Sequence, residues 1–242
     1  MSANLPMLAL IADAGGQSVA TDIQSAIAGA SSSGRIVQMV ALLSVLSIAP
    51  SILIMTTSFT RVIVALSFLR SGLGMQSTPA NLLMTSLALF MTYFIMAPTF
   101  ERAWTDGVAP LVESRITDRE AIDRIVQPFR AFMSRNVRDK DLLLFEQLAS
   151  KSQETAAADT VELRILVPAF MISELRRGFE IGFMIALPFL VIDLVVATIT
   201  MSMGMMMLPP SVIALPVKVL FFVLIDGWSL LVGSIVRSYG AS

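Results

Sequence analysis

Methionine side chains are concentrated near the C-terminal end of this 242-residue chain, where five of seven consecutive residues are methionine. Thioether sulfurs are soft ligands that suit Cu(I), and the unbranched side chain also deforms easily to close an irregular opening. Two prolines follow, and tandem proline cannot continue an α-helix. The segment therefore predicts a flexible apolar gate at a helix break, made of Met201, Met203, Met205, Met206, Met207, Pro209 and Pro210.

Two other interpretations of these methionines remain open. Methionine also fills irregular gaps between helices in ordinary packing. The Met-x-Met-x-Met spacing at 201, 203 and 205 would suit Cu(I) capture, but the chain has no cysteine or histidine to complete such a site. We therefore favour the gate, and we expect no metal and no cofactor.

Asp193 and Lys218 are the only charged residues between Ile181 and Ile225. A charge inside an apolar segment is costly unless it is paired or faces water. An antiparallel hairpin that turns at the methionines brings the two charges to one level, either within one chain or between neighbouring copies. We predict a buried charge pair with a role in function or, alternatively, an inert structural pair. In both cases the loss of one partner is more damaging than the loss of both.

The composition is that of a membrane protein. Hydrophobic residues make up 55% of the chain and charged residues 14%, and the mean hydropathy is +0.78, whereas about a quarter of the residues in a soluble domain are charged. The lack of cysteine and histidine excludes ordinary zinc sites and the common nucleophile–base pairs. No phosphate-binding loop is present, and a net charge of -1 gives no basic stripe for nucleic acid. We expect neither an enzyme nor a nucleic-acid partner.

The apolar residues fall into about four hydrophobic segments that predict kinked helical hairpins, so the fold class is an all-α membrane protein. The segments cover 36–60, 79–97, 181–200 and 211–236, with Pro50, Pro188 and Pro216 inside three of them. Most charged residues lie in the middle of the chain. The predicted regions are a mobile tail or signal remnant at 1–34, an N-terminal apolar hairpin at 35–100, a polar helical extramembrane domain at 101–167 and a C-terminal apolar hairpin at 168–242.

Charges beside the segments give a conflicting topology. Arg61 and Arg70, interpreted as residues between the first two segments, favour the cytoplasm and place the polar domain on the outer side. Arg176 and Arg177, however, adjoin the third segment on that outer side. Broken helices at membrane depth persist only where protein or a cavity covers them. We infer that the chain packs mainly against partner chains rather than against lipid.

Several stretches together resemble the FliP family of flagellar secretion proteins, whose injectisome relatives form the SctR group. The stretches are PSILIMTTSFTRVIVALSFLR, PAFMISELRRGFEIGF, PFLVIDLVVATI and GMMMLPPSVIALPVKVLFFVLIDGWSLLVGSIVRSY, and the resemblance runs from the region of Arg35 to the C-terminus. Spacing alone predicts a solvated helix face for the charges around Glu174. The motif residues are Pro168, Phe170, Glu174, Gly178, Phe179, Gly182, Asp226, Gly227 and Trp228.

The resemblance implies a core pore subunit of the type III export gate, in the bacterial inner membrane and the flagellar basal body. It implies that five copies of the chain assemble with FliQ and FliR, that FlhB and FlhA are further partners, and that lipid surrounds the complex. The cargo is then unfolded flagellar polypeptides. The polar domain is expected on the periplasmic side.

The resemblance also implies roles for particular residues. Asp193 and Lys218 support the assembled, export-competent state, and the surroundings of Asp226-Gly227-Trp228 look more like the flagellar branch of the family. An injectisome export gate subunit, a small-solute or Cu(I) transporter and a membrane scaffold without a pore remain alternatives. The residues that would form a gasket in the closed pore are Met205, Met206 and Met207.

Overall fold

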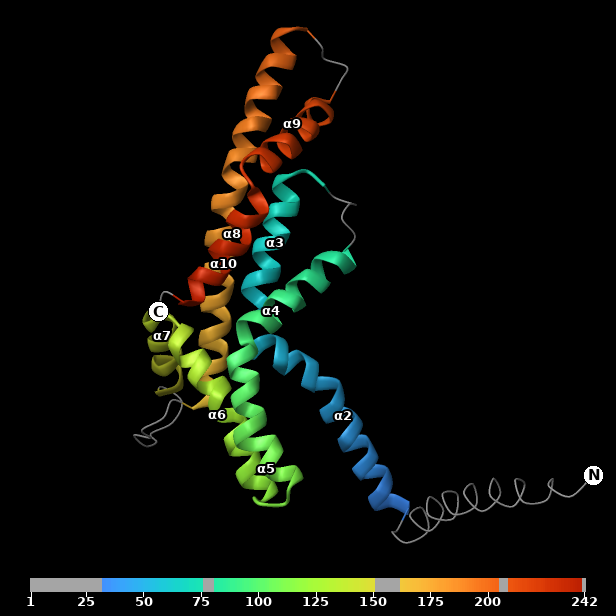
Figure 1. The fold of residues 1–242 in the computed structure, drawn as a ribbon, viewed down its shortest axis with the longest axis vertical. Coiled ribbons are helices and arrows are strands. Elements are labelled where there is room, and N and C mark those ends of the chain that lie inside the picture. Colours follow the sequence, from blue (N-terminus) through green and yellow to red (C-terminus); the bar gives the residue numbers. More distant parts are fainter. Residues whose placement is uncertain (1–31, 76–80, 151–161, 205–208, 241–242) are drawn as a thin grey trace, which may run out of the picture. The chain divides into compact units, whose positions relative to one another are not determined.

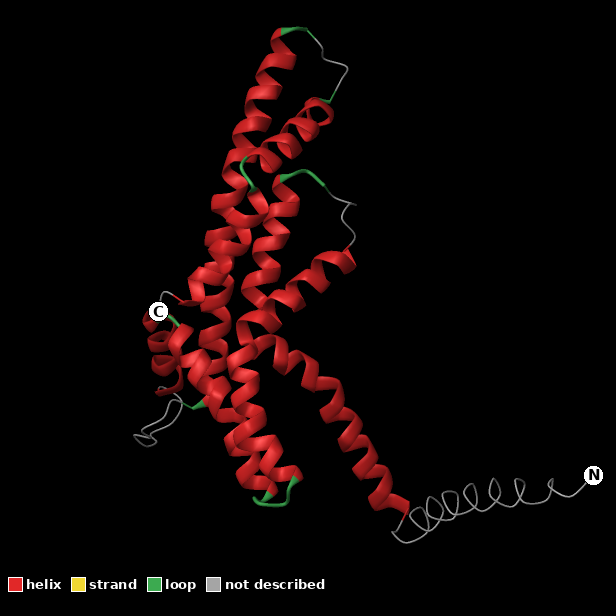
Figure 2. Ribbon diagram, in the orientation of Figure 1, coloured by secondary structure: helices red, strands yellow, loops and turns green. Residues whose placement is uncertain are grey.

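The computed structural model describes residues 32–75, 81–150, 162–204 and 209–240. All regular secondary structure in these ranges is helical (Figure 2), which confirms the all-α prediction for the described part of the chain. The chain divides into two units, residues 1–52 and 53–242. The described part of the first unit belongs to α2 (Ser32–Thr56), an apolar helix that runs through Pro50.

The second unit contains α8 (Leu163–Ser202), a single helix of 40 residues that continues through Pro168 and Pro188. α3 (Phe59–Gly72) packs along it (Figure 1). The region interpreted from the sequence as a connection between two spans, which holds Arg61 and Arg70, is therefore a helix of its own. The interpretation of these two arginines as loop charges is wrong.

Two glycines of α8 make the contact with α3 possible. A Cβ atom on Gly178 would lie 3.1 Å from the carbonyl oxygen of Arg61, and one on Gly182 would lie 2.6 Å from the Cβ atom of Phe68. Small residues spaced four apart share one helix face and let two backbones approach closely. Both glycines are among the predicted motif residues, and a side chain at either position would crowd α3.

The helix α4 (Asn81–Ala103) passes through Pro98 and continues into a π-helix, η1 (Trp104–Val108), and then into α5 (Ala109–Val112). The turn of η1 lies close against α6 (Asp118–Asn136), because a Cβ atom on Gly107 would lie 2.5 Å from the Ile125 side chain. π-Helical turns are rare and are often found at functional sites.

The polar region forms α6 and α7 (Asp139–Ser150). α6 begins with a capping residue, because the side-chain oxygen of Thr117 accepts a hydrogen bond from the backbone N–H of Glu120. An apolar cluster holds α4, α6 and α8 together, and it includes Met96, Phe132, Met133, Leu166 and Phe170.

The C-terminal region consists of α9 (Pro210–Leu224) and α10 (Gly227–Gly240), which meet at an angle of 63°. The break lies at Asp226, where φ is +51°. The sequence placed the bend at Pro216, but α9 continues through that residue. The expected location of the bend is therefore wrong.

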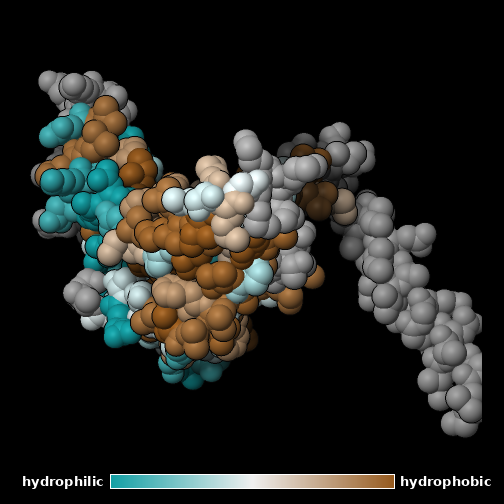
Figure 3. Space-filling view, turned by 90° about the horizontal axis from the view of Figure 1, so that it is seen from above, coloured by the Kyte–Doolittle hydropathy of each residue, from teal (hydrophilic) through white to brown (hydrophobic). Residues whose placement is uncertain are grey.

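Within the described residues, two helical stretches are long and apolar enough to cross a membrane, Asn81–Val112 and Leu163–Ser202, and the number rises to four if each bent helix pair counts as one span. Many large apolar side chains on α8 and α9 are exposed, among them Met184, Leu194 and Leu220. Figure 3 shows a broad apolar surface, with hydrophilic residues gathered mostly at its edges. Such a surface is typical of a chain covered by lipid or by other proteins.

Candidate functional site

The two charges of the C-terminal hairpin lie together. Lys218 Nζ on α9 lies 2.6 Å from Asp193 Oδ2 on α8 and 3.0 Å from the carbonyl oxygen of Gly72, the last residue of α3. The Lys218 side chain is 6% exposed, whereas that of Asp193 is 42% exposed. Carbonyl groups at a helix C-terminus lack intrahelical partners and carry partial negative charge. One buried lysine therefore joins three helices.

The methionine-rich segment connects α8 to α9. Met201 and Met203 lie at the C-terminal end of α8 and are 70% and 67% exposed. Gly204 follows with φ of +73°, a left-handed conformation that commonly ends a helix. Pro209 is the N-cap of α9 and Pro210 its first residue. The three residues expected to form the gasket, Met205, Met206 and Met207, lie outside the described residues.

A second charge cluster, which the sequence did not predict, joins α3, α8 and α10. Arg61 and Glu174 are both fully buried. The guanidinium group donates to both carboxylate oxygens of Glu174, with Nε 3.0 Å from Oε2. It also donates to Ser238 Oγ at 2.7 Å. The sequence placed Glu174 on a solvated helix face, and this prediction is wrong because α3 covers that face.

Tyr239 completes this cluster. Its hydroxyl group donates a hydrogen bond to Glu174 Oε2, and its ring lies under the Arg61 guanidinium group with 3.7 Å from Cζ to the ring centroid. The ring also contacts Phe132 on α6, with 5.7 Å between the ring centroids. Burial of an ion pair is tolerated only where further hydrogen bonds satisfy both groups, and Tyr239 supplies one of them. The cluster thus ties the end of α10 to three other helices.

One feature of the sequence could have predicted that Arg61 is buried. Ala65 and Leu69 follow it at intervals of four residues, and both are buried. An arginine in register with a helix face of small and apolar residues is expected to point into the protein, where it needs a carboxylate. No comparable signal marks Tyr239, because tyrosine is common at exposed and buried positions alike.

A smaller polar contact holds α7 against α8. Ser173 Oγ donates to Asp141 Oδ2 at 2.8 Å and accepts a hydrogen bond from the backbone N–H of Arg138 at 3.1 Å. Asp141 is 6% exposed and Ser173 is fully buried. Neither residue is distinguished by its local sequence, since serine and aspartate are ordinary in a polar helical region.

The Asp226-Gly227-Trp228 motif forms the break between α9 and α10. A Cβ atom on Gly227 would lie 2.1 Å from the ring of Phe222, so no other residue fits there without displacing that ring. Trp228 packs edge-on against the same ring, with 5.4 Å between centroids. The positive φ of Asp226 suits a short polar residue. The motif therefore sets the path of the chain between two helices.

The remaining motif residues lie on α8. Phe170 is fully buried and packs edge-on against Phe132 at 5.9 Å. Phe179 is 51% exposed and packs edge-on against Phe68 at 5.2 Å. Pro168 is half-buried in the first turns of the helix. These residues support helix packing and do not converge on Asp193 and Lys218.

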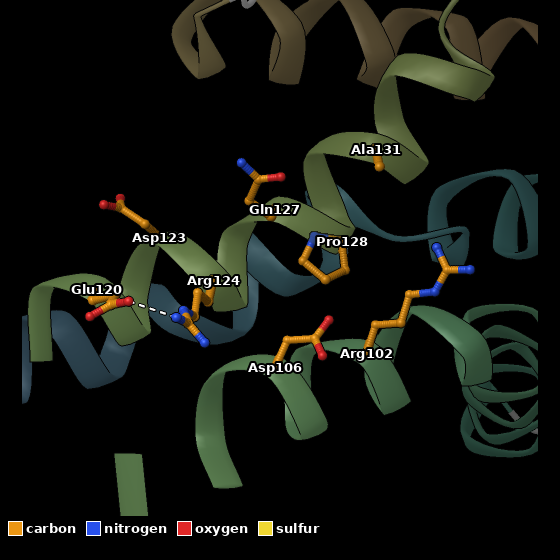
Figure 4. Close-up of a pocket in the computed structure, with 8 residues that line it drawn as sticks. All are labelled: Arg102, Asp106, Glu120, Asp123, Arg124, Gln127, Pro128 and Ala131. Carbon is orange, nitrogen blue, oxygen red and sulfur yellow. Dashed lines mark hydrogen bonds and ion pairs between the residues drawn. The ribbon is translucent and has the colours of Figure 1, made fainter. Parts of the chain in front are cut away.

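A groove of about 480 Å³ runs between the end of α4 with η1 and the first half of α6 (Figure 4). Its charges are mixed, and Arg124 pairs with Glu120 at 2.7 Å. Within the described residues, no group of three or more Asp, Glu, His or Cys side chains could hold a metal ion. The groove is lined by Arg102, Asp106, Glu120, Asp123, Arg124, Gln127, Pro128 and Ala131.

These features define a class of protein: a helical chain of membrane-protein composition, whose long apolar helices are joined by one fully buried and one partly buried ion pair and whose apolar surface needs a covering of lipid or protein. Residues 42–235 match the model of the FliP family. The chain is 58% identical to the flagellar biosynthetic protein FliP of Rhizobium meliloti, over 97% of this chain and 96% of that protein.

Two further relatives carry the same name. The chain is 56% identical to the flagellar biosynthetic protein FliP of Agrobacterium fabrum, over 96% of both chains. It is 49% identical to that of Bacillus subtilis, over 84% of this chain and 91% of the relative. The chain belongs to the FliP family, which confirms the resemblance seen in its motifs.

Proposed function

We propose that the chain is a pore subunit of the flagellar type III protein export gate and passes unfolded flagellar polypeptides across the inner membrane. The names of its relatives support flagellar use over injectisome use. In this proposal five copies assemble with FliQ and FliR in the basal body, where FlhB and FlhA are neighbours. The subunit works mechanically, by opening and closing, rather than by catalysing a reaction.

The observation that carries the proposal is the hairpin of α8 and α9. The C-terminal end of α8 carries two exposed methionines, Met201 and Met203, and a proline pair starts α9. When several copies meet, such tips can supply a ring of soft side chains at one level. Methionine side chains deform to exclude water and ions and yield to an arriving polypeptide, whereas branched side chains are stiffer. Met205, Met206 and Met207 would form the gasket.

The contact of Lys218 with Asp193 and Gly72 gives this hairpin a fixed base. It holds α9 against α8 and the end of α3. We propose that the charge pair keeps the hairpin in the geometry that the assembled gate requires. The exposed apolar side chains of α8 and α9 would then face neighbouring subunits.

Alanine at the three gasket positions tests the proposal. The variant Met205→Ala, Met206→Ala, Met207→Ala is expected to assemble but to leak ions, because the shorter side chains leave the constriction open. The leak is measured as ion conductance of the complex in planar bilayers. A matched variant with leucine at the same three positions keeps the side-chain volume and should stay closed. Unchanged conductance in the alanine variant would defeat the gasket.

Assembly is tested by native mass spectrometry of the tagged chain extracted gently from membranes. Several copies together with two other small hydrophobic proteins support an export-gate core. A lone monomer or dimer contradicts it and favours a transporter.

The side of the membrane that the polar helices face is also open to measurement, and we propose the periplasm. The chain contains no cysteine, so a single Ser134→Cys change on the exposed surface of α6 gives one labelling site. A membrane-impermeant maleimide should label it in cells whose outer membrane alone is permeable. Labelling only after the inner membrane is lysed would place the helix in the cytoplasm.

A further inference from the structure

The C-terminal end of α3 has a regular capping structure. Gly74 has φ of +77°, the left-handed conformation that suits glycine, and its backbone N–H donates to the carbonyl oxygen of Ser71 at 3.0 Å. The backbone N–H of Met75 donates to the carbonyl oxygen of Arg70 at 3.3 Å. These two hydrogen bonds are those of a Schellman motif. Neither of them uses the carbonyl oxygen of Gly72, the last residue of the helix.

Lys218 supplies a donor to that remaining oxygen. Its Nζ atom lies 3.0 Å from the Gly72 carbonyl oxygen, and a Cβ atom on Gly74 would lie 3.8 Å from the same nitrogen. A cation near the last carbonyl groups of a helix caps it, because those groups carry partial negative charge. In Figure 1 the end of α3 lies beside α8 and α9. Lys218 therefore caps α3 from another helix, in addition to its ion pair with Asp193.

A buried ammonium group needs more than one acceptor. The Lys218 side chain is 6% exposed, whereas the Asp193 side chain is 42% exposed, so solvent screens this ion pair from the aspartate side. An ammonium group has three N–H donors, and a buried donor without a partner is costly. The Gly72 carbonyl oxygen satisfies one of these donors, so its position determines whether the lysine stays buried.

Packing fixes the end of α3 only in part. A Cβ atom on Gly72 would lie 2.9 Å from the ring of Phe189 and 3.3 Å from the Cβ atom of Ala186, so α3 approaches α8 closely here. Leu73 is 3% exposed and belongs to the same apolar cluster as Phe189. These contacts hold the helix axis in place. A hydrogen bond also depends on direction, and the direction of the last carbonyl group depends on the chain that follows it.

The side chain of Arg70 joins this capping structure to the start of α4. Its Nε atom donates to the carbonyl oxygen of Met75 at 3.0 Å, and its Nη1 atom donates to Oδ1 of Asn81, the first residue of α4. Arg70 is half-buried and Asn81 is exposed. A planar guanidinium group holds two acceptors in a fixed geometry, which a lysine ammonium group does not. One side chain thus links the end of the capping structure to the helix that follows.

We propose that Arg70 and Asn81 are positioning residues for the site of Lys218. Arg70 holds the Met75 carbonyl group and the start of α4 together, and this link keeps the end of α3 in the conformation that directs the Gly72 carbonyl group at the lysine. The methionine-bearing hairpin is thereby coupled to the start of α4. The consequence for export rests on the proposed function, in which the lysine and its charge pair keep the hairpin in the geometry that the gate requires.

The test is acylation of the full-length protein in detergent with acetic anhydride, followed by mass spectrometry of its peptides. The chain has three lysines, Lys140, Lys151 and Lys218, and the exposed Lys140 is the internal reference. Lys218 should react slowly in the wild type, because its ammonium group must first leave its acceptors. Arg70→Gln should raise the rate at Lys218 relative to Lys140 about fivefold, the change that the loss of one ordinary hydrogen bond makes in an equilibrium.

Two changes at Asn81 form a matched pair. Asn81→Ala removes the oxygen that accepts from Arg70 and should raise the rate at Lys218 as Arg70→Gln does. Asn81→Asp keeps an acceptor oxygen and adds a charge opposite to that of Arg70, so it should leave the rate unchanged. Tyr239→Phe acts at the other charge cluster and is the control for a general loss of stability. It should leave the ratio of the two lysine rates unchanged.

Two results would overturn the proposal. The first is an equal ratio of the Lys218 and Lys140 rates in the wild type, in Arg70→Gln and in Asn81→Ala. The second is a rise in Asn81→Asp or Tyr239→Phe as large as that in Arg70→Gln, because the effect would then be a general loosening of the fold.

Motility of cells that carry Arg70→Gln separates this inference from the proposed gate. A faster reaction at Lys218 together with reduced motility supports both. A faster reaction with normal motility supports the positioning role and contradicts the role of the charge pair in the gate. An unchanged reaction overturns the positioning role, whatever the motility.

Discussion

The hydroxyl group of Tyr239 offers the sharpest test of the buried charge cluster. Tyr239→Phe removes the hydrogen bond to Glu174 but keeps the ring, which still packs on Phe132 and lies under the Arg61 guanidinium group. A hydrogen bond to a charged group contributes about 1.5–3 kcal/mol. Because Glu174 is fully buried, bulk water does not replace the lost donor. The free energy of unfolding should therefore fall by about 1.5–3 kcal/mol.

The assay is denaturant unfolding of the full-length chain in detergent micelles, followed by the fluorescence of its two tryptophans. Tyr93→Phe is the matched control, because Tyr93 is the only other tyrosine and is 65% exposed. It should change stability by less than about 0.5 kcal/mol. If both variants lose the same free energy of unfolding, Arg61 alone satisfies the Glu174 carboxylate and the role assigned to Tyr239 is refuted.

Three further predictions concern the two ion pairs and the glycine contact between α8 and α3. Arg61→Met should cost more than Tyr239→Phe in the same assay, about 3–5 kcal/mol, because it leaves a buried carboxylate without its cation; a smaller loss would show that Glu174 becomes neutral or hydrated. Asp193→Ala should reduce motility more than Lys218→Met, because it leaves a lysine that is 6% exposed without its partner, whereas the aspartate is 42% exposed. The double variant should be less impaired than the sum of the two single variants. Additive losses would argue against a functional pair. Gly182→Ala should destabilise the chain by about 1–3 kcal/mol, since its Cβ meets backbone-proximal atoms of α3; Gly240→Ala, with open space around it, is the control, and equal effects would contradict the packing argument.

Local features of the sequence predicted the helical class, the break after the methionines and the candidate charges of the C-terminal hairpin. These follow from composition and from the chemistry of single residues: apolar runs form helices, and Pro209 and Pro210 cannot continue one. The same reasoning failed at α3. Arg61 and Arg70 bound a short apolar stretch, which looks like a connection between spans until a second helix is seen to cover it.

The tertiary structure alone decided which groups meet. Arg61 and Glu174 are 113 residues apart, and the sequence around each residue does not indicate that the other is its partner. A buried charge requires an opposite charge and further hydrogen bonds, but the helix that supplies them depends on how the whole chain packs. The contact of Lys218 with Asp193 is local to one hairpin and was accessible to pattern reasoning. The contact of Lys218 with the Gly72 carbonyl could not be predicted in this way, because only the packing of α3 brings the end of that helix to the lysine.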